Sequence, residues 1–197
     1  MKKIILTLAL AAVAAVCANA QIGVGVGYAS TTLKGDNTTT NLGGLTFGAT
    51  YNIPLVNGLA VAPGIQFAMQ NYKEDDNNYR KENYIAIPVL FNYGIELVDG
   101  IKLVPYLGPT FSYGISGVVA GGATAFGITV STGEVNLYGD NSTYAPFDIL
   151  VGGGVALDVM DMVRAYVGYN IGLLDRNTSD NAVLKASGVN FGVAYLF

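Results

Sequence analysis

The chain has 197 residues, enough for one domain, and it contains no histidine and a single cysteine, Cys17. Its formal net charge is −4 at pH 7, which does not indicate a basic nucleic-acid-binding surface. Without histidine, a Ser-His hydrolase or a His-dependent acyltransferase is excluded in its familiar form. We therefore expect a protein that is not an enzyme, needs no cofactor and binds no nucleic acid.

The first twenty residues have the three parts of a secretory signal peptide. Two lysines follow the initiator methionine, residues 4–16 form an apolar run, and Ala18 and Ala20 frame a small-x-small cleavage site. The run is too short for a membrane-spanning helix. Cys17 raises the alternative of a lipoprotein, but the valine before it fits poorly with the small residue that lipidation normally requires. We expect cleavage after Ala20, which makes Gln21 the new N-terminus.

The opening of the mature chain, QIGVGVG, places glycines at 23, 25 and 27. A dinucleotide-binding fingerprint needs G-x-G-x-x-G between a strand and a helix. Here the third glycine comes one position early and a polar stretch follows, so the nucleotide interpretation fails. Alternating glycines suit a strand whose inner face lines a narrow, crowded barrel.

From residue 21 onward, glycine and turn-forming residues divide the chain into segments of about ten residues, the length of a tilted membrane strand. Most segments alternate between apolar and small or polar residues. In the stretch 163–171, the odd positions are apolar or aromatic and the even positions include Arg164, Gly168 and Asn170. This period of two predicts one face against lipid and the other facing a polar lumen.

Eight such strands are predicted, and their connections alternate in length. Outer-membrane barrels have an even strand number, short periplasmic turns and long outer loops. We therefore predict an all-β chain: a signal peptide over 1–20, then an eight-stranded antiparallel up-and-down transmembrane β-barrel over 21–197, integral to the bacterial outer membrane. The predicted strands are 21–33, 42–53, 58–71, 83–97, 101–115, 145–157, 162–174 and 187–197.

The last strand places Phe191, Val193, Tyr195 and the terminal Phe197 on one face. This pattern resembles the C-terminal strand that marks outer-membrane proteins for insertion. The resemblance implies two partners, namely outer-membrane lipid and the barrel assembly machinery.

A proline-containing strand with Pro88 is followed, across a tight turn, by a strand reading Pro105, Tyr106, x, Gly108. This pair resembles the PorT-like outer-membrane β-barrel domain family, and the general shape is similar to small OmpX- and OmpA-type barrels of Gram-negative bacteria. The resemblance implies a barrel over residues 21–197. One branch of that family takes part in protein secretion, and no residue in this chain singles out that branch.

Four charges, Glu96, Lys102, Asp158 and Arg164, fall on inward positions near the predicted periplasmic rim. Charges that point into a narrow lumen must pair, because an isolated buried charge is costly. We expect ion pairs that plug the lumen, with a gated proton or ion path as the alternative. An eight-stranded interior is just filled by side chains, so a diffusion pore is not expected.

Two polar runs, KEDDNN at 73–78 and DRNTSDN at 175–181, raise the question of a Ca²⁺ site. The first lacks the glycine and distal glutamate of an EF-hand loop. We expect both runs to be solvated loops without metal, the first balanced by Arg80, Lys81 and Glu82.

The longest connection, 116–144, is the main functional candidate. AFGITVS and EVNLYG flank TG and predict a hairpin beyond the membrane. Its edge could receive an extracellular or envelope protein partner, or the hairpin could cap the barrel. We predict a structural or surface-interaction role; the alternatives are a small pore or transporter, and a soluble periplasmic β-barrel that binds an apolar ligand.

Overall fold

The structure is a computed structural model, and it describes residues 21–35, 39–73, 78–125, 128–138, 144–177 and 183–197. The predicted signal peptide, with Ala18 and Ala20 at its cleavage site, lies outside the described residues. Among the described residues, no helix is long and apolar enough to cross a bilayer.

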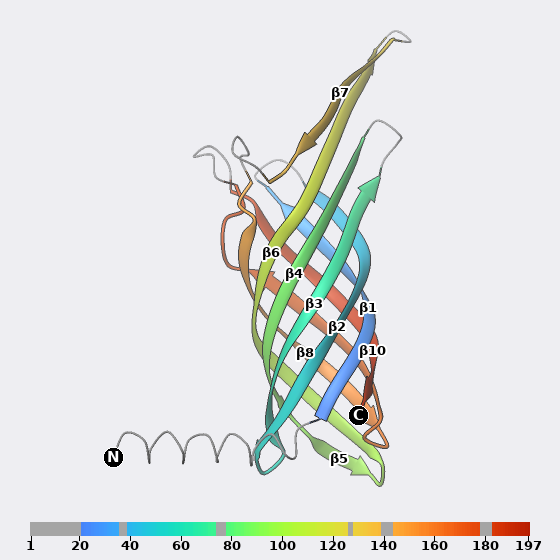
Figure 1. Ribbon diagram of the computed structural model, residues 1–197, viewed down its shortest axis with the longest axis vertical. Coiled ribbons are helices and arrows are strands. Elements are labelled where there is room, and N and C mark those ends of the chain that lie inside the picture. Colours follow the sequence, from blue (N-terminus) through green and yellow to red (C-terminus); the bar gives the residue numbers. More distant parts are fainter. Residues whose placement is uncertain (1–20, 36–38, 74–77, 126–127, 139–143, 178–182) are drawn as a thin grey trace, which may run out of the picture.

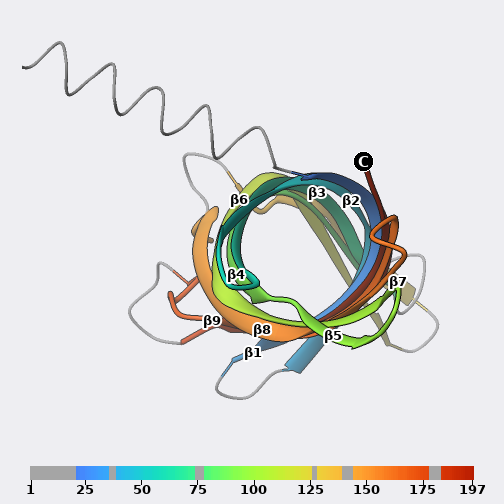
Figure 2. The same cartoon turned by 90° about the horizontal axis from the view of Figure 1, so that it is seen from below.

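The described chain is a closed antiparallel β-barrel (Figures 1 and 2). Neighbouring strands pair in chain order, the first pairs with the last, and β4 pairs with β6 to complete the ring. β5 continues the line of β4 after a break at Gly94, and β7 pairs with β6 beyond the wall. The wall therefore has eight strands, as predicted. The strands are β1 (Gln21–Lys34), β2 (Thr39–Val56), β3 (Leu59–Lys73), β4 (Tyr79–Tyr93), β5 (Ile95–Val98), β6 (Ile101–Ala125), β7 (Ile128–Asn136), β8 (Phe147–Val159), β9 (Val163–Gly172) and β10 (Lys185–Leu196).

The period-two pattern sorts side chains as the sequence predicts. Val26, Leu45 and Val193 point outward and are about half exposed or more, at 60%, 61% and 51%. Phe191, Tyr195 and Phe197 lie on the same outer surface, where Tyr195 and Phe197 stack edge to face at 4.8 Å. An outer wall of apolar side chains needs a hydrocarbon environment, whereas the inner wall carries the polar groups.

The long-loop ends of β4 and β6 extend well beyond the bounds that the sequence predicts. β4 begins at Tyr79 rather than at 83, and β6 continues to Ala125 rather than ending at 115. The two extensions pair with each other, from Tyr79 opposite Ala120 to Asn83 opposite Ser116. Residues 79–82 and 116–120, which were predicted to lie in outer loops, thus belong to the barrel wall.

The predicted hairpin within 116–144 exists, but its turn was wrongly placed. β6 and β7 form its two arms and rise beyond the other strands (Figure 1). The predicted turn at Thr132 and Gly133 instead lies inside β7, opposite Gly121, where the register with β6 shifts. Gly133 has φ +73°, so the pair supplies a β-bulge rather than the turn.

Candidate functional site: the two ends of the lumen

The four charges predicted near the short-turn end of the barrel lie in one row across four strands. Glu96 on β5 is opposite Lys102 on β6, Lys102 is opposite Asp158 on β8, and Asp158 is opposite Arg164 on β9. Arg164 donates two hydrogen bonds to Asp158, from Nε to Oδ1 at 2.6 Å and from Nη2 to Oδ2 at 2.7 Å. This bidentate pair is the strongest contact of the row.

Lys102 has a different partner from the one its register position suggests. Its Nζ donates to both carboxylate oxygens of Asp161 at 2.7 Å, and both side chains are well exposed. Asp161 was missed because it belongs to the β8–β9 turn, where its φ is +53°. The Glu96 side chain is exposed and lies outside both ion pairs. All five residues line an open vestibule of about 660 Å³.

Two tyrosines occupy the middle of the lumen against the glycine rows. A Cβ built on Gly168 would lie 2.4 Å from the Tyr106 hydroxyl oxygen. A Cβ built on Gly27 or Gly192 would lie 2.6 Å from the Tyr166 hydroxyl oxygen. The glycines on the inner face therefore make room for tyrosines that reach from other strands, which is the small-against-large arrangement of narrow barrels.

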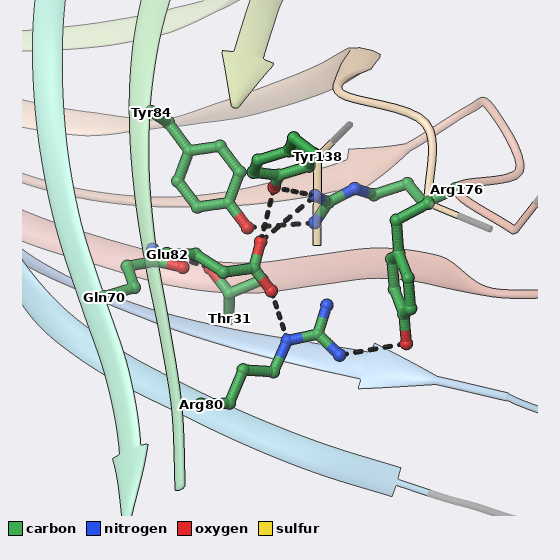
Figure 3. Close-up of polar contacts among 8 residues, drawn as sticks. Thr31, Gln70, Arg80, Glu82, Tyr84, Tyr138 and Arg176 are labelled. Atoms are coloured by element: carbon green, nitrogen blue, oxygen red, sulfur yellow. Dashed lines mark hydrogen bonds and ion pairs between the residues drawn. The ribbon is translucent and has the colours of Figure 1, made fainter. Parts of the chain in front are cut away.

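The long-loop end holds a buried ionic cluster that the sequence analysis did not predict (Figure 3). Its centre is Glu82 on β4, whose side chain is 0% exposed. One carboxylate oxygen accepts from Arg80 Nε, and the other accepts from Arg176 Nη2 at 3.1 Å. The Arg176 side chain is 3% exposed and also donates from Nη1 to the Tyr84 hydroxyl at 3.0 Å. Two buried arginines therefore share one buried carboxylate.

Arg176 reaches this cluster from the opposite side of the barrel. It lies in the β9–β10 connection, 94 positions from Glu82, and three wall strands separate β4 from β10 in either direction around the ring. Its backbone is fixed by two hydrogen bonds, from its own N–H to Leu184 O at 2.8 Å and from Ala145 N–H to its carbonyl at 2.9 Å. The Arg176–Glu82 contact is thus a tie across the mouth of the barrel.

Tyr138, which follows β7, joins the hairpin to the same tie. Its hydroxyl donates to Glu82 Oε2 at 2.8 Å and accepts from Arg176 Nη2 at 2.7 Å. Its ring fills the space above two glycines of β6, since a Cβ on Gly114 would lie 2.3 Å from the ring and one on Gly117 2.9 Å. Burial, and then the nearby Glu82 charge, raises the pKa of Tyr138, so its hydroxyl keeps the proton that it donates.

Below the tie, the lumen contains a cavity of about 210 Å³. Arg176 and Asp148 line its upper part, and Arg164 lines its lower part. Burial lowers the pKa of Arg176, but attraction to the Glu82 and Asp148 carboxylates and the hydrogen bond to Glu82 outweigh it, so the net shift is upward and the guanidinium stays charged. Within the described chain, Asp148 Oδ2 and Arg176 Nε are buried without a hydrogen-bond partner.

These positions correct two expectations about solvated loops. Arg80 and Glu82 were expected to balance the run at 73–78 in water, and Arg176 was expected in a polar loop, yet all three are buried. A signal for Arg80 and Glu82 was present, because they continue the inward phase of Tyr84 on an unbroken strand. Residues 74–77 and 178–182 lie outside the described residues. Among those described, no three or more cysteine, aspartate or glutamate residues gather as they would around a metal ion.

Comparison with known proteins assigns the architecture to a family. Residues 14–176 match the outer membrane protein beta-barrel domain. The chain belongs to this family. It is therefore an integral protein of the bacterial outer membrane with lipid around its apolar wall, and this excludes the soluble periplasmic alternative.

Two solved structures, Ail and Neisserial surface protein A, show the same fold at low sequence identity. Ail, the attachment invasion locus protein of Yersinia pestis, is 15% identical with a TM-score of 0.53, over 90% of this chain and 98% of that one. Neisserial surface protein A is 17% identical with a TM-score of 0.56, over 89% and 97%. The outer membrane enzyme PagL is 10% identical, over 87% and 97%, with a TM-score of 0.44. The search of curated proteins found no match.

Proposed function

We propose that this barrel is a surface-interaction protein whose lumen is closed at rest and whose β6–β7 hairpin contacts a partner protein. Short turns are periplasmic in outer-membrane barrels, which places the hairpin on the outer side. The observation that carries the proposal is the tie from Arg176 to Glu82 across the mouth, which Tyr138 joins to a hairpin that projects past the wall (Figure 1). The role requires no catalysis and no cofactor.

The closed lumen is supported chiefly at the mouth, which the tie crosses. Further down, Tyr106 and Tyr166 narrow the lumen and Asp158 pairs with Arg164, while the cavity of about 210 Å³ continues past these residues toward the vestibule. Such contacts fit the general rule that eight strands enclose a space that side chains nearly fill. The small pore is therefore the less favoured function for the resting state.

The interaction role is supported by the shape of the hairpin. Among the described strands, β7 pairs with β6 and with no other strand. A strand that is paired on one side presents backbone N–H and C=O groups on the other, and a partner strand can add there. Membership of the PorT-like family belongs to the same proposal, supported by the strand pair with Pro88 and Pro105.

Two further proposals concern export and membrane insertion, one for each end of the chain. We propose that the barrel assembly machinery reads the outward row of Phe191, Val193, Tyr195 and Phe197, which all lie on the outer wall. We also propose cleavage after Ala20, supported by the small residues Ala18 and Ala20 that follow the apolar run.

The test is cross-linked co-purification from native outer membranes. Replacing residues 121–133 with Asn-Gly shortens the hairpin but keeps Ala120 opposite Glu134, and it leaves Tyr138 in the tie. The matched control replaces residues 74–78 with Asn-Gly, which shortens another outer loop and keeps Lys73 opposite Tyr79. We expect a protein partner that is lost with the first variant and retained with the second. Retention of the same partners by both variants would contradict the role of the hairpin.

A further inference from the structure

We propose that the tie is a latch: when Arg176 withdraws from Glu82, the lumen becomes a path for small cations. This inference rests on the closed resting lumen proposed above. It adds an activity, regulated ion passage, that surface interaction does not require.

A polar route already exists beneath the latch. The cavity of about 210 Å³ extends from Arg176 and Tyr84 at the mouth to Asn92 and Arg164 at the other end. Asn92 and Arg164 also line the open vestibule of about 660 Å³. Hydroxyl and amide side chains that can replace water around an ion line the cavity, namely Thr46, Thr50, Gln66, Gln70, Ser112, Asn170 and Asn190.

Arg176 differs from Arg80 and Glu82 because it reaches the cluster from outside the wall strands. Arg80 and Glu82 lie on β4, which is paired with β3 on one side and with β6 on the other, so they are fixed in the wall. Arg176 and Tyr138 both lie in connections outside the strands. Turning either side chain away from Glu82 breaks its contacts while the wall stays intact, which is the geometry of a latch mounted outside the wall.

The net charge of the groups that remain along the route determines which ions can pass. With Arg176 withdrawn, acidic groups outnumber basic groups along the route, and an excess of carboxylates attracts cations. The acidic groups are Glu82, Asp148, Asp158, Asp161 and Glu96, and the basic groups are Arg80, Arg164 and Lys102. The class of solute is therefore a small monovalent cation such as K⁺.

The first measurement is conductance of the purified barrel in planar bilayers across a KCl gradient. We expect the wild type to be silent and Arg176→Ala to give discrete steps whose reversal potential shows a preference for K⁺ over Cl⁻. Lys185→Ala is the matched control, because it removes an exposed cation at the start of β10, where that connection ends and outside the latch, and it should stay silent. Folding of each variant is checked by its heat-dependent migration on a gel.

The second measurement uses chemical access from the outer side. Ser112 lines the cavity, and the only native cysteine in the sequence, Cys17, precedes the barrel. In Ser112→Cys, a cationic thiosulfonate reagent should react about tenfold or more faster when Arg176→Ala is also present, and faster than an anionic reagent of similar size.

Three results would overturn the inference or its basis. A folded Arg176→Ala barrel that is silent and no more reactive at position 112 than its parent would eliminate the cation path and leave the closed surface protein intact. Steps without preference for K⁺ would eliminate the cation selectivity. A wild type that conducts as well as Arg176→Ala would instead refute the closed resting lumen.

Discussion

The two ends of the lumen hold their charges in different ways. At the short-turn end, Asp158 and Arg164 are six positions apart and face each other on neighbouring strands, with side chains 7% and 16% exposed. At the long-loop end, Glu82 and Arg176 are 94 positions apart and meet across the barrel, with side chains 0% and 3% exposed. One pair follows from strand register, whereas the other depends on how a connection folds back into the mouth.

The difference in burial also implies a difference in energy. A charge that is removed from water interacts strongly with its partner, but it becomes a large penalty if that partner is lost. The cluster around Glu82 should therefore be sensitive to the loss of any member. The exposed ion pair of Lys102 and Asp161 should contribute little.

The largest effect is expected for Glu82→Gln, which keeps the shape of the side chain but leaves Arg80 and Arg176 without their shared carboxylate. We expect a loss of about 3–5 kcal/mol in the free energy of unfolding, the usual cost of breaking a buried ion pair. Urea unfolding in lipid vesicles, followed by circular dichroism, measures this. A loss no larger than that of a surface substitution would show that the mouth is hydrated and that the two ends are alike.

Gly168→Ala tests the neutral middle of the lumen, between the two charged ends. The new methyl group would overlap the Tyr106 hydroxyl, and the other nearest atoms lie at 3.1 Å. We expect a loss of about 1–3 kcal/mol, as for overpacked cores. Because removing the hydroxyl removes the overlap, Tyr106→Phe should restore most of the stability of Gly168→Ala in a double-mutant cycle. Additive losses in the double mutant would show that Tyr106 is not what the glycine accommodates.

Lys102→Met tests the exposed ion pair at the short-turn end against the buried cluster at the long-loop end. The Lys102–Asp161 pair is exposed at 36% and 57%, so water and salt screen it. We expect a change in the free energy of unfolding of about 1 kcal/mol or less, compared with Glu82→Gln under identical conditions. A loss as large as that of Glu82→Gln would mean that the vestibule is drier than its exposure indicates.

The smallest effect is a local dependence on pH at Asp175, beside the latch. The N–H groups of Leu184 and Asn177 donate to its carboxylate at 2.8 and 2.9 Å and lower its pKa, and Lys185 adds attraction. Because the folded pKa is lowered, the contact is fully present above the ordinary pKa of about 3.9 and is lost as pH falls through the lowered value. Hydrogen exchange of these two amides, corrected for intrinsic rates, should accelerate between about pH 5 and pH 2. In Asp175→Ala this acid step should be absent, and an equal step there would contradict the assignment.

The barrel wall was predictable from the sequence because it depends on contacts between residues that are close in the chain. Outward residues such as Val24 and Phe47 repeat every second position, and a shift by one residue would place every side chain on the wrong face. The register of neighbouring strands then aligns Asp158 with Arg164. Each of these features depends on residues that are close in the sequence.

The tie between Arg176 and Glu82 was not predictable, because it depends on residues far apart in the sequence. Arg176 lies in a run of Asp, Asn, Thr and Ser that has the composition of a solvated loop. Its burial results from backbone hydrogen bonds to Leu184 and Ala145 and from a partner 94 positions away. The turn of the hairpin was misplaced for a related reason, since a glycine at positive φ serves a β-bulge as well as a turn.

The span of the Arg176–Glu82 contact has a consequence for the order of folding. Glu82 belongs to β4 and Arg176 follows β9, the seventh of the eight wall strands, so the two meet only after most of the chain has been added to the sheet. Contacts between residues far apart in sequence form late, because the intervening chain must first be ordered. The mouth of this barrel is therefore sealed as one of the last events of its biogenesis, and the buried Glu82 carboxylate marks a molecule whose ring is already complete.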